Sequence, residues 1–354
     1  MTVTRSGTAR RSVSPAFARC VLLCAALAGL LPGCGSGPQY LTLEGATMGT
    51  YYRVTASCPG VGRDTLSSAA EATLAEVNAR MSTYQEASEL SAFNRAPVDV
   101  WLPASTELRT VIRAAREISV MSAGAFDVTV GPLVNLWGFG PEGSISRSPS
   151  PEAIEEARQR VGNGYLELDD QRGALRKRRA LYVDLSAIAK GYGVDQLVDR
   201  LAALGCADLL VDIGGEVAGR GHNPAGRPWQ IGIEVPDPET FGAVQKIVPI
   251  GDMALATSGD YRNYLDLEDG RRVSHTVDPR TGMPVFHDLA SVTVLHDSAM
   301  WADGLATALN VLGPEAGPAL AEREGLAATF LIRRADGFEE RYTPAMRNYL
   351  AAHP

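Results

Sequence analysis

The chain has 354 residues, with 33 lysines and arginines against 41 aspartates and glutamates, so its formal charge at pH 7 is -8. This length suffices for a sizeable core in one large domain or two closely packed ones. An acidic surface argues against nucleic acid as a partner. Five cysteines are too few for a disulfide framework to hold such a chain together.

The first 33 residues have the pattern of a secretory leader. Four arginines and no acidic residue precede the apolar run Cys20–Leu31, which is too short to span a membrane as a mature helix. The run ends in Leu-Pro-Gly-Cys34, which resembles a bacterial lipobox, although Pro32 replaces the usual small residue. We therefore expect residues 1–33 to be a lipoprotein signal peptide and Cys34 to carry lipid such as palmitate. An ordinary cleaved signal peptide is the alternative.

The mature chain is more acidic than the whole, because loss of the four leader arginines changes the formal charge from -8 to -12. Residues 34–39 have the composition of a short polar tether, and residues 40–354 are expected to form a single domain. Lipid anchoring predicts a place in the bacterial cell envelope, on the periplasmic side of the cytoplasmic membrane or in the outer membrane. The sequence leaves open whether Cys58 and Cys206 form a disulfide.

The elements before the middle of the chain alternate between strand and helix patterns. Tyr40–Thr55 predicts two strands around a glycine turn, and apolar spacing predicts helices following Asp64 and over residues 105–121. Residues 137–150 are rich in glycine, serine and proline, which is typical of an exposed loop. Residues 165–184 predict a hairpin that turns at Gly173.

The stretch Asp184–Gly191 joins an apolar, strand-favouring run, Ala180–Val183, to a helix pattern that ends at Gly205. A strand that leads into a helix start leaves unpaired backbone N–H groups, and these favour an anion. Lys190 adds a positive charge in the first turn of that helix. The stretch is therefore a candidate phosphate site beside the Asp184 carboxylate, and a strand-to-helix corner with a solvated lysine is the alternative.

The second half of the chain adds many strands. Strands are predicted at 207–213, 229–235, 246–256 and 289–295, with a hairpin at 264–277, a helix from 299 to 312 stopped by Gly313, one more helix, a strand at 327–332 and a terminal hairpin. Many strands joined as hairpins and interspersed with helices indicate an α+β fold, with mixed or antiparallel sheets flanked by helices.

Three residues in this half could take part in metal binding or catalysis. Asp303 and Thr307 are four residues apart on a predicted helix, so both oxygens project from one face. Mg²⁺ prefers such hard oxygen ligands, and a hydrogen-bonded buried pair is the alternative. His275 lies in a hairpin, where a lone histidine is more often structural than catalytic. A Ser-His-Asp hydrolase is a poor fit, because the Gly-x-Ser-x-Gly elbow is absent from the sequence.

Eight short motifs follow one another across almost all of the mature chain. They are Thr47-Met48-Gly49-Thr50, Met81-Ser82-Thr83-Tyr84, Ala125-Phe126-Asp127, Asp184-Leu185 with Ala189-Lys190-Gly191, Asp212-Ile213-Gly214-Gly215, Thr257-Ser258-Gly259-Asp260-Tyr261, His275 to Gly282, and Ala302-Asp303 with Ala306-Thr307. In this order they resemble the FAD:protein FMN transferases, the ApbE family of flavin transferases. Each motif alone is weak, whereas eight in family order are a specific pattern.

The resemblance implies a flavin-transferase (T-fold-like) architecture and an enzyme that moves the FMN half of FAD onto a threonine or serine hydroxyl of another protein. Mg²⁺ would assist at the FAD diphosphate, and AMP would leave. The acceptors would be flavoprotein subunits, such as those of membrane redox complexes. The alternatives are a Mg²⁺-dependent FAD pyrophosphatase, which yields FMN and AMP, and a lipid-anchored flavin-binding protein without turnover.

The resemblance also implies roles for individual residues. Asp303, Thr307 and the carbonyl of Ala187 would hold the metal. His275 would be the catalytic base, with Asp184 or Asp260 as competitors for that role. Ser186 departs from the glycine that family members often have there. The residues expected to line the FAD site are Met48, Tyr84, Ala125, Phe126, Asp127, Asp184, Lys190 and Val277.

Overall fold

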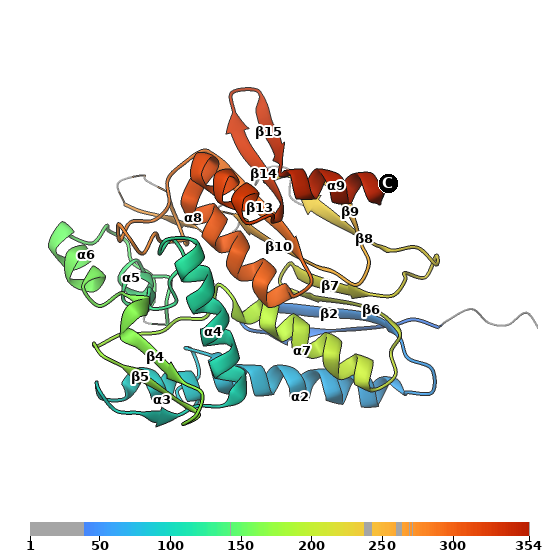
Figure 1. Cartoon of the computed structure of the whole chain (residues 1–354), viewed down its shortest axis with the longest axis horizontal. Coiled ribbons are helices and arrows are strands. Elements are labelled where there is room, and N and C mark those ends of the chain that lie inside the picture. The colour runs from blue at the N-terminus through green and yellow to red at the C-terminus, as the bar shows by residue number, and fades with distance from the viewer. Residues whose placement is uncertain are drawn as a thin grey trace, which may run out of the picture. The chain divides into compact units, whose positions relative to one another are not determined.

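The computed structural model describes residues 39–353 of the chain, apart from residues 142, 237–242, 260–263, 269 and 271. Within these residues eight strands form one antiparallel sheet, which Figure 1 shows behind a layer of helices. In spatial order the strands are β1 (Leu41–Thr47), β2 (Thr50–Ser57), β6 (Asp208–Ile213), β7 (Glu216–Arg220), β10 (Ala254–Gly259), β13 (Leu289–His296), β14 (Ala327–Arg334) and β15 (Gly337–Tyr342).

Successive strand residues point to opposite sides of the sheet, and in β13 and β14 residues of both sides are buried. In β10, Leu255 packs with Leu295 and Leu331 on one face, whereas Ala256 packs with Val292 and Phe330 on the other. Helices cover the Ala256 face. They are α2 (Arg63–Met81), α4 (Thr106–Met121), α7 (Ala189–Ala203) and α8 (Ala299–Arg323), of which α7 and α8 lie side by side in Figure 1.

The Leu255 face is covered by a hairpin and the last helix. Trp229, Val248 and Met346 pack there in the same cluster as Leu255. They belong to β8 (Trp229–Glu234), β9 (Val244–Ile250) and α9 (Pro344–Ala352). The remaining elements are α3 (Glu89–Arg95), β3 (Leu102–Pro103), α5 (Gly131–Leu136), α6 (Pro151–Arg158), a 3-10 turn (Asn163–Tyr165), β4 (Leu166–Asp169), β5 (Ala174–Lys177), β11 (Tyr264–Asp266) and β12 (Arg272–Ser274).

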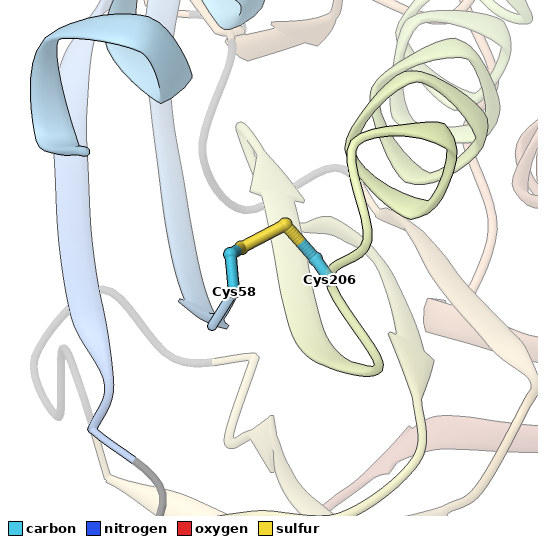
Figure 2. The surroundings of a disulfide bond; sticks show 2 residues. All are labelled: Cys58 and Cys206. Atoms are coloured by element: carbon cyan, nitrogen blue, oxygen red, sulfur yellow. A yellow bond between two sulfur atoms is a disulfide. The ribbon is translucent and has the colours of Figure 1, made fainter. Parts of the chain in front are cut away.

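A disulfide joins Cys58, which follows β2, to Cys206, which lies between α7 and β6 (Figure 2). The two cysteines are 148 residues apart in the sequence. A cross-link that closes so long a loop restricts the unfolded chain strongly and typically stabilises by about 2–4 kcal/mol. The pairing that the sequence left open therefore ties the first hairpin to the far end of α7.

The start of α8 is fixed by a carboxylate of α7. Asp195 accepts hydrogen bonds from Ser298 Oγ at 2.6 Å, from the Ala299 N–H at 2.7 Å and from the Met300 N–H at 3.1 Å. A negative charge at a helix N-terminus satisfies donors that the helix leaves unpaired and complements its dipole. The contact sets where α8 begins relative to α7.

A glycine lets the two helices approach closely. A Cβ atom at Gly191 of α7 would lie 2.2 Å from the carbonyl oxygen of Ala299 in α8, closer than any side chain tolerates. Two residues further on, a Cβ at Gly193 would meet only side-chain atoms, with Met48 Cε at 3.0 Å and Ile213 Cδ1 at 3.2 Å. Gly191 is therefore the position at which backbone meets backbone.

Residues 180–183, which precede α7, do not form the expected strand. Residues 180–183 form only an isolated bridge, between Tyr182 and Val130. The reason is a side chain that takes the place of a strand partner, since the Asn94 amide donates to the Val183 carbonyl and accepts from its N–H, each at 2.8 Å. The predicted strand is wrong, although the helix after it is confirmed.

The predicted strand at 246–256 is also wrong in its extent. The chain turns at Gly251–Met253, so β9 ends in the hairpin with β8 and β10 joins the large sheet. Asp252 holds this turn by accepting from the Gly221 N–H at 2.8 Å. In α8, Gly313 has the non-helical angles φ 79° and ψ -171°, so the first helical segment ends there as predicted and a second helical segment follows.

Residues Tyr40–Pro354 form one compact unit. The leader, Cys34 and the tether up to residue 38 lie outside the described residues, so the expected segment boundaries and the lipid anchor stay predictions. Among the described helices none is both long and apolar enough to cross a membrane.

We expect Gly191→Ala to destabilise the fold and Gly193→Ala to be tolerated. Both changes gain roughly 1 kcal/mol of helix propensity, but only the first places a methyl group against backbone that cannot move aside. Overpacking of this kind costs typically 1–3 kcal/mol. The measurement is the urea midpoint followed by tryptophan fluorescence. Equal midpoints for the two variants would contradict the proposed backbone contact.

Candidate active site

A pocket of about 790 Å³ opens at the edge where several elements of the large sheet and its helices end. Its wall combines the turn between β6 and β7, the N-terminus of α7, the first half of α8, the end of β10 and the segment after β12. Of the residues predicted to bind FAD, Tyr84, Asp184, Lys190 and Val277 line it. So do the predicted metal ligands Ala187, Asp303 and Thr307 and the predicted base His275.

The floor of the pocket includes the turn that starts α7. Asp184 Oδ1 accepts from the Ser186 N–H at 2.8 Å and from Ser186 Oγ at 2.5 Å, so the serine at the glycine-favoured position braces the turn through its own hydroxyl. The N-cap residue Ile188 makes no side-chain hydrogen bond, but two N–H groups of the first turn of α7 are bonded, that of Ala189 to the Leu185 carbonyl at 2.8 Å and that of Gly191 to Asp303 at 3.0 Å. The Lys190 ammonium is therefore the group of this turn that suits the region to an anion.

Three charged side chains meet beside this turn. The Lys190 ammonium lies 3.4 Å from Glu216 Oε2 and 3.9 Å from Asp303 Oδ1. Burial lowers the pKa of Lys190, but the negative charges of Asp303 and Glu216 more than offset this, so its pKa lies above the ordinary lysine value. Burial raises the pKa of both carboxyl groups against the opposing effect of Lys190.

The oxygens around Asp303 suit a hard divalent cation. Asp303 Oδ2 accepts from the Gly191 N–H at 3.0 Å, which aims the carboxylate while Oδ1 lies beyond hydrogen-bond distance of Lys190. Thr307 and Ala187 line the same pocket. In the described part of the chain no three His, Cys, Asp or Glu side chains are arranged to hold a metal. The donors available are the Asp303 carboxylate, the Thr307 hydroxyl and the Ala187 carbonyl. Such oxygen donors fit Mg²⁺, which usually completes its shell with water and phosphate oxygens.

His275 follows β12 directly and is half-buried in the pocket wall. Its ring packs edge-on against Phe139, with ring centroids 6.4 Å apart. Two hydrogen bonds fix the loop that carries Phe139, since Trp137 Nε1 donates to the Gly282 carbonyl at 2.8 Å and the Tyr84 hydroxyl donates to the Phe139 carbonyl at 3.2 Å. The predicted exposed loop at 137–150 thus contributes Phe139 to the site.

Four residues expected at the FAD site do not line this pocket. Ala125 and Phe126 are buried in the core. Asp127 is buried as well and accepts from Thr129 and from the Asn163 N–H, at 2.7–2.8 Å. Met48 has φ 48° and packs beside α7. Their roles toward FAD stay predictions, and Asp260 lies outside the described residues.

Comparison with known proteins gives the family. The model of the ApbE family matches residues 48–330. The chain belongs to the ApbE family. It is 40% identical over 333 residues to the FAD:protein FMN transferase of Haemophilus influenzae, covering 92% of this chain and 96% of that one. It is 43% identical over 325 residues to the protein of the same name from Vibrio cholerae, covering 91% and 96%.

Solved structures of the ApbE family share the fold. The flavin transferase ApbE from Vibrio cholerae superimposes with a TM-score of 0.81 at 42% identity, covering 88% of this chain and 99% of that one. The apo flavinyl transferase ApbE from Pseudomonas stutzeri gives 0.81 at 44% identity, covering 88% and 96%. The predicted α+β fold with helices flanking antiparallel sheets is thereby confirmed.

Sequence reasoning did not select Glu216 as a member of this ApbE site. Its signal was present, because Glu216 follows Gly214-Gly215 and directly precedes the apolar residues Val217 and Ala218. Charged residues are rarely fully buried unless they are paired. The partner, Lys190, comes from helix α7, and only the fold brings it beside strand β7.

Proposed function

We propose that this protein is a Mg²⁺-dependent transferase that moves the FMN half of FAD onto a threonine or serine hydroxyl of an acceptor protein. The observation that carries the proposal is the meeting of Lys190, Asp303 and His275, from three separate elements, in one pocket. Relatives named FAD:protein FMN transferase, aligned over nearly their whole length, support it.

The residues of the pocket have the properties that this reaction requires. The Lys190 ammonium, in the first turn of α7, would bind and orient the FAD diphosphate. Asp303, Thr307 and the Ala187 carbonyl would hold Mg²⁺, which when bound neutralises charge on the diphosphate. Catalysis of phosphoryl transfer consists mainly of such positioning and charge stabilisation.

His275 would accept the proton of the attacking hydroxyl. The acceptor oxygen forms a new bond to the FMN phosphorus, the bond from that phosphorus to AMP breaks, and AMP carries away the bonding pair. A hydroxyl is a poor nucleophile until a base takes its proton, and histidine is the usual base. Asp184 lines the same pocket and remains the competitor, together with Asp260.

We also propose that the enzyme works in the bacterial envelope, on a lipid anchor at Cys34, with residues 40–354 as its single domain. The acceptors would then be flavoprotein subunits at the membrane. The Cys58–Cys206 disulfide supports an oxidising compartment, because structural disulfides persist there and are rare in the cytosol. The anchor would lie on the periplasmic side of the cytoplasmic membrane or in the outer membrane.

The transfer reaction is tested with purified protein, FAD, Mg²⁺ and a threonine-containing acceptor. Covalent flavin on the acceptor is expected, whereas free FMN with AMP would show a pyrophosphatase and unchanged FAD a binder. Chelation by EDTA should abolish transfer, as should Asp303→Ala, because each removes the metal. Asp297→Ala, at a side chain that is 87% exposed just before α8, is the matched control and should transfer normally.

We expect His275→Ala and His275→Gln to bind FAD like the parent but to lose transfer by on the order of 10²-fold or more, the scale of a lost general base. FAD binding is followed by fluorescence quenching and transfer by in-gel flavin fluorescence. His222→Gln, at a histidine that is 62% exposed, serves as the control. Normal transfer by the His275 variants would assign the base elsewhere, and lost FAD binding would make His275 a binding residue.

The anchor is tested on protein extracted from membranes of a bacterial host. Mass spectrometry should find an N-terminal, lipid-modified Cys34, and Cys34→Ser should release the protein from the membrane fraction. A mature chain that retains residues 1–33, or that is soluble with an unmodified Cys34, would refute the anchor while leaving the transferase proposal untouched.

A further inference from the structure

Glu216 is a buried carboxylate whose place in the pocket the proposed reaction does not yet explain. It opens β7, directly after the Gly214–Gly215 turn, and its side chain is only 6% exposed. Burial of a carboxylate is costly unless it is paired. A negative charge beside a site for an anionic diphosphate is also unfavourable, so the side chain needs a compensating role.

The only cation that the structure pairs with Glu216 among the described residues is Lys190. Their separation of 3.4 Å is that of an ion pair, and Glu216 Oε2 makes no well-aligned hydrogen bond in the described part of the chain. On its other side the ammonium lies 3.9 Å from Asp303. Lys190 is thus held between two carboxylates and is closer to Glu216.

Both ends of this arrangement are held by backbone contacts. Glu216 pairs with Ile213 across the β6–β7 ladder, and Asp212 accepts from the Gly215 N–H at 2.9 Å, which holds the turn. At the other end the Gly191 N–H donates to Asp303, so the start of α7 cannot move away from α8. The two carboxylates are held in place, and their opposing attractions set the position of the flexible Lys190 side chain.

We propose that Glu216 is a positioning residue that holds the Lys190 ammonium toward the diphosphate and away from Asp303. This rests on the proposed function. Without Glu216 the ammonium would close onto Asp303, the nearest remaining carboxylate, where it would leave the anion site and occupy an oxygen needed by the metal. Glu216 therefore supports binding of an anion although it is itself negative.

The sign of the change in FAD affinity when Glu216 loses its charge distinguishes a positioning role from a purely electrostatic one. Removal of a negative charge from a pocket should tighten the binding of an anionic ligand when charge alone matters. Loss of a positioning contact should weaken it. Glu216→Gln keeps the shape of the side chain and removes the charge, so the sign of its effect on FAD affinity distinguishes the two.

The experiment measures FAD affinity by fluorescence quenching without an acceptor, in EDTA and in Mg²⁺, for a double-mutant cycle of Glu216→Gln and Lys190→Met. We expect Glu216→Gln to weaken FAD binding on the order of tenfold in the parent and to cause no weakening in the Lys190→Met background, since contacting residues couple in such cycles. The Mg²⁺ concentration for half-maximal transfer should also rise. Glu76→Gln, exposed on α2, is the charge-matched control.

Three outcomes would overturn the positioning role: tighter FAD binding by Glu216→Gln, unchanged binding, or an equal loss in both Lys190 backgrounds. Glu216→Asp keeps the charge and should bind more tightly than Glu216→Gln, which also covers the case that the glutamine variant folds poorly. Because affinity is read without turnover, a parent protein that fails to flavinylate an acceptor refutes the transferase and not the Glu216–Lys190 coupling.

Discussion

The docking of α7 against α8 is the constraint on which the site depends. Asp195 holds the N-terminus of α8, and Gly191 allows the two backbones to meet. One consequence is that Lys190 and Asp303, carried by different helices, face each other across a fixed gap. The helix contact that completes the core thus also sets the spacing of the reactive groups, which is why a methyl group at position 191 would disturb both.

The pocket concentrates charge in a wall with little access to water. When both carboxyl groups are ionised, Lys190, Glu216 and Asp303 together carry two negative charges and one positive charge, and each carboxyl group is more than nine-tenths buried. In a low-dielectric wall such charges act strongly on a ligand. A diphosphate diester and a divalent cation carry opposite charges of equal size, so together they leave the net charge at this wall unchanged, whereas either ion alone would shift it.

The sequence predicts local structure better than tertiary contacts. Hairpins, the long helices and the helix end at Gly313 follow from spacing and glycine, and the motif order identified the family. What it missed arises from tertiary contacts: Asn94 replaces a strand partner of Val183, and Glu216 finds Lys190 only in the fold. The terminal helix α9 was missed although Thr343-Pro344 marks its start, where Thr343 accepts from the Met346 N–H. Its apolar face packs against β14 and the β8–β9 hairpin, and these partners are not evident from the sequence.

The strand order of the large sheet has a kinetic consequence. β2 lies beside β6 and β7 beside β10, so strands distant in the sequence must find each other before the sheet can close. Pairings of this kind slow folding, because the chain loses conformational entropy before the stabilising contacts form. The pocket takes its walls from residues 51 to 307 and cannot exist in any early fragment. Flavin affinity is therefore acquired last, and a folding chain cannot bind its substrate until nearly the whole sheet has assembled.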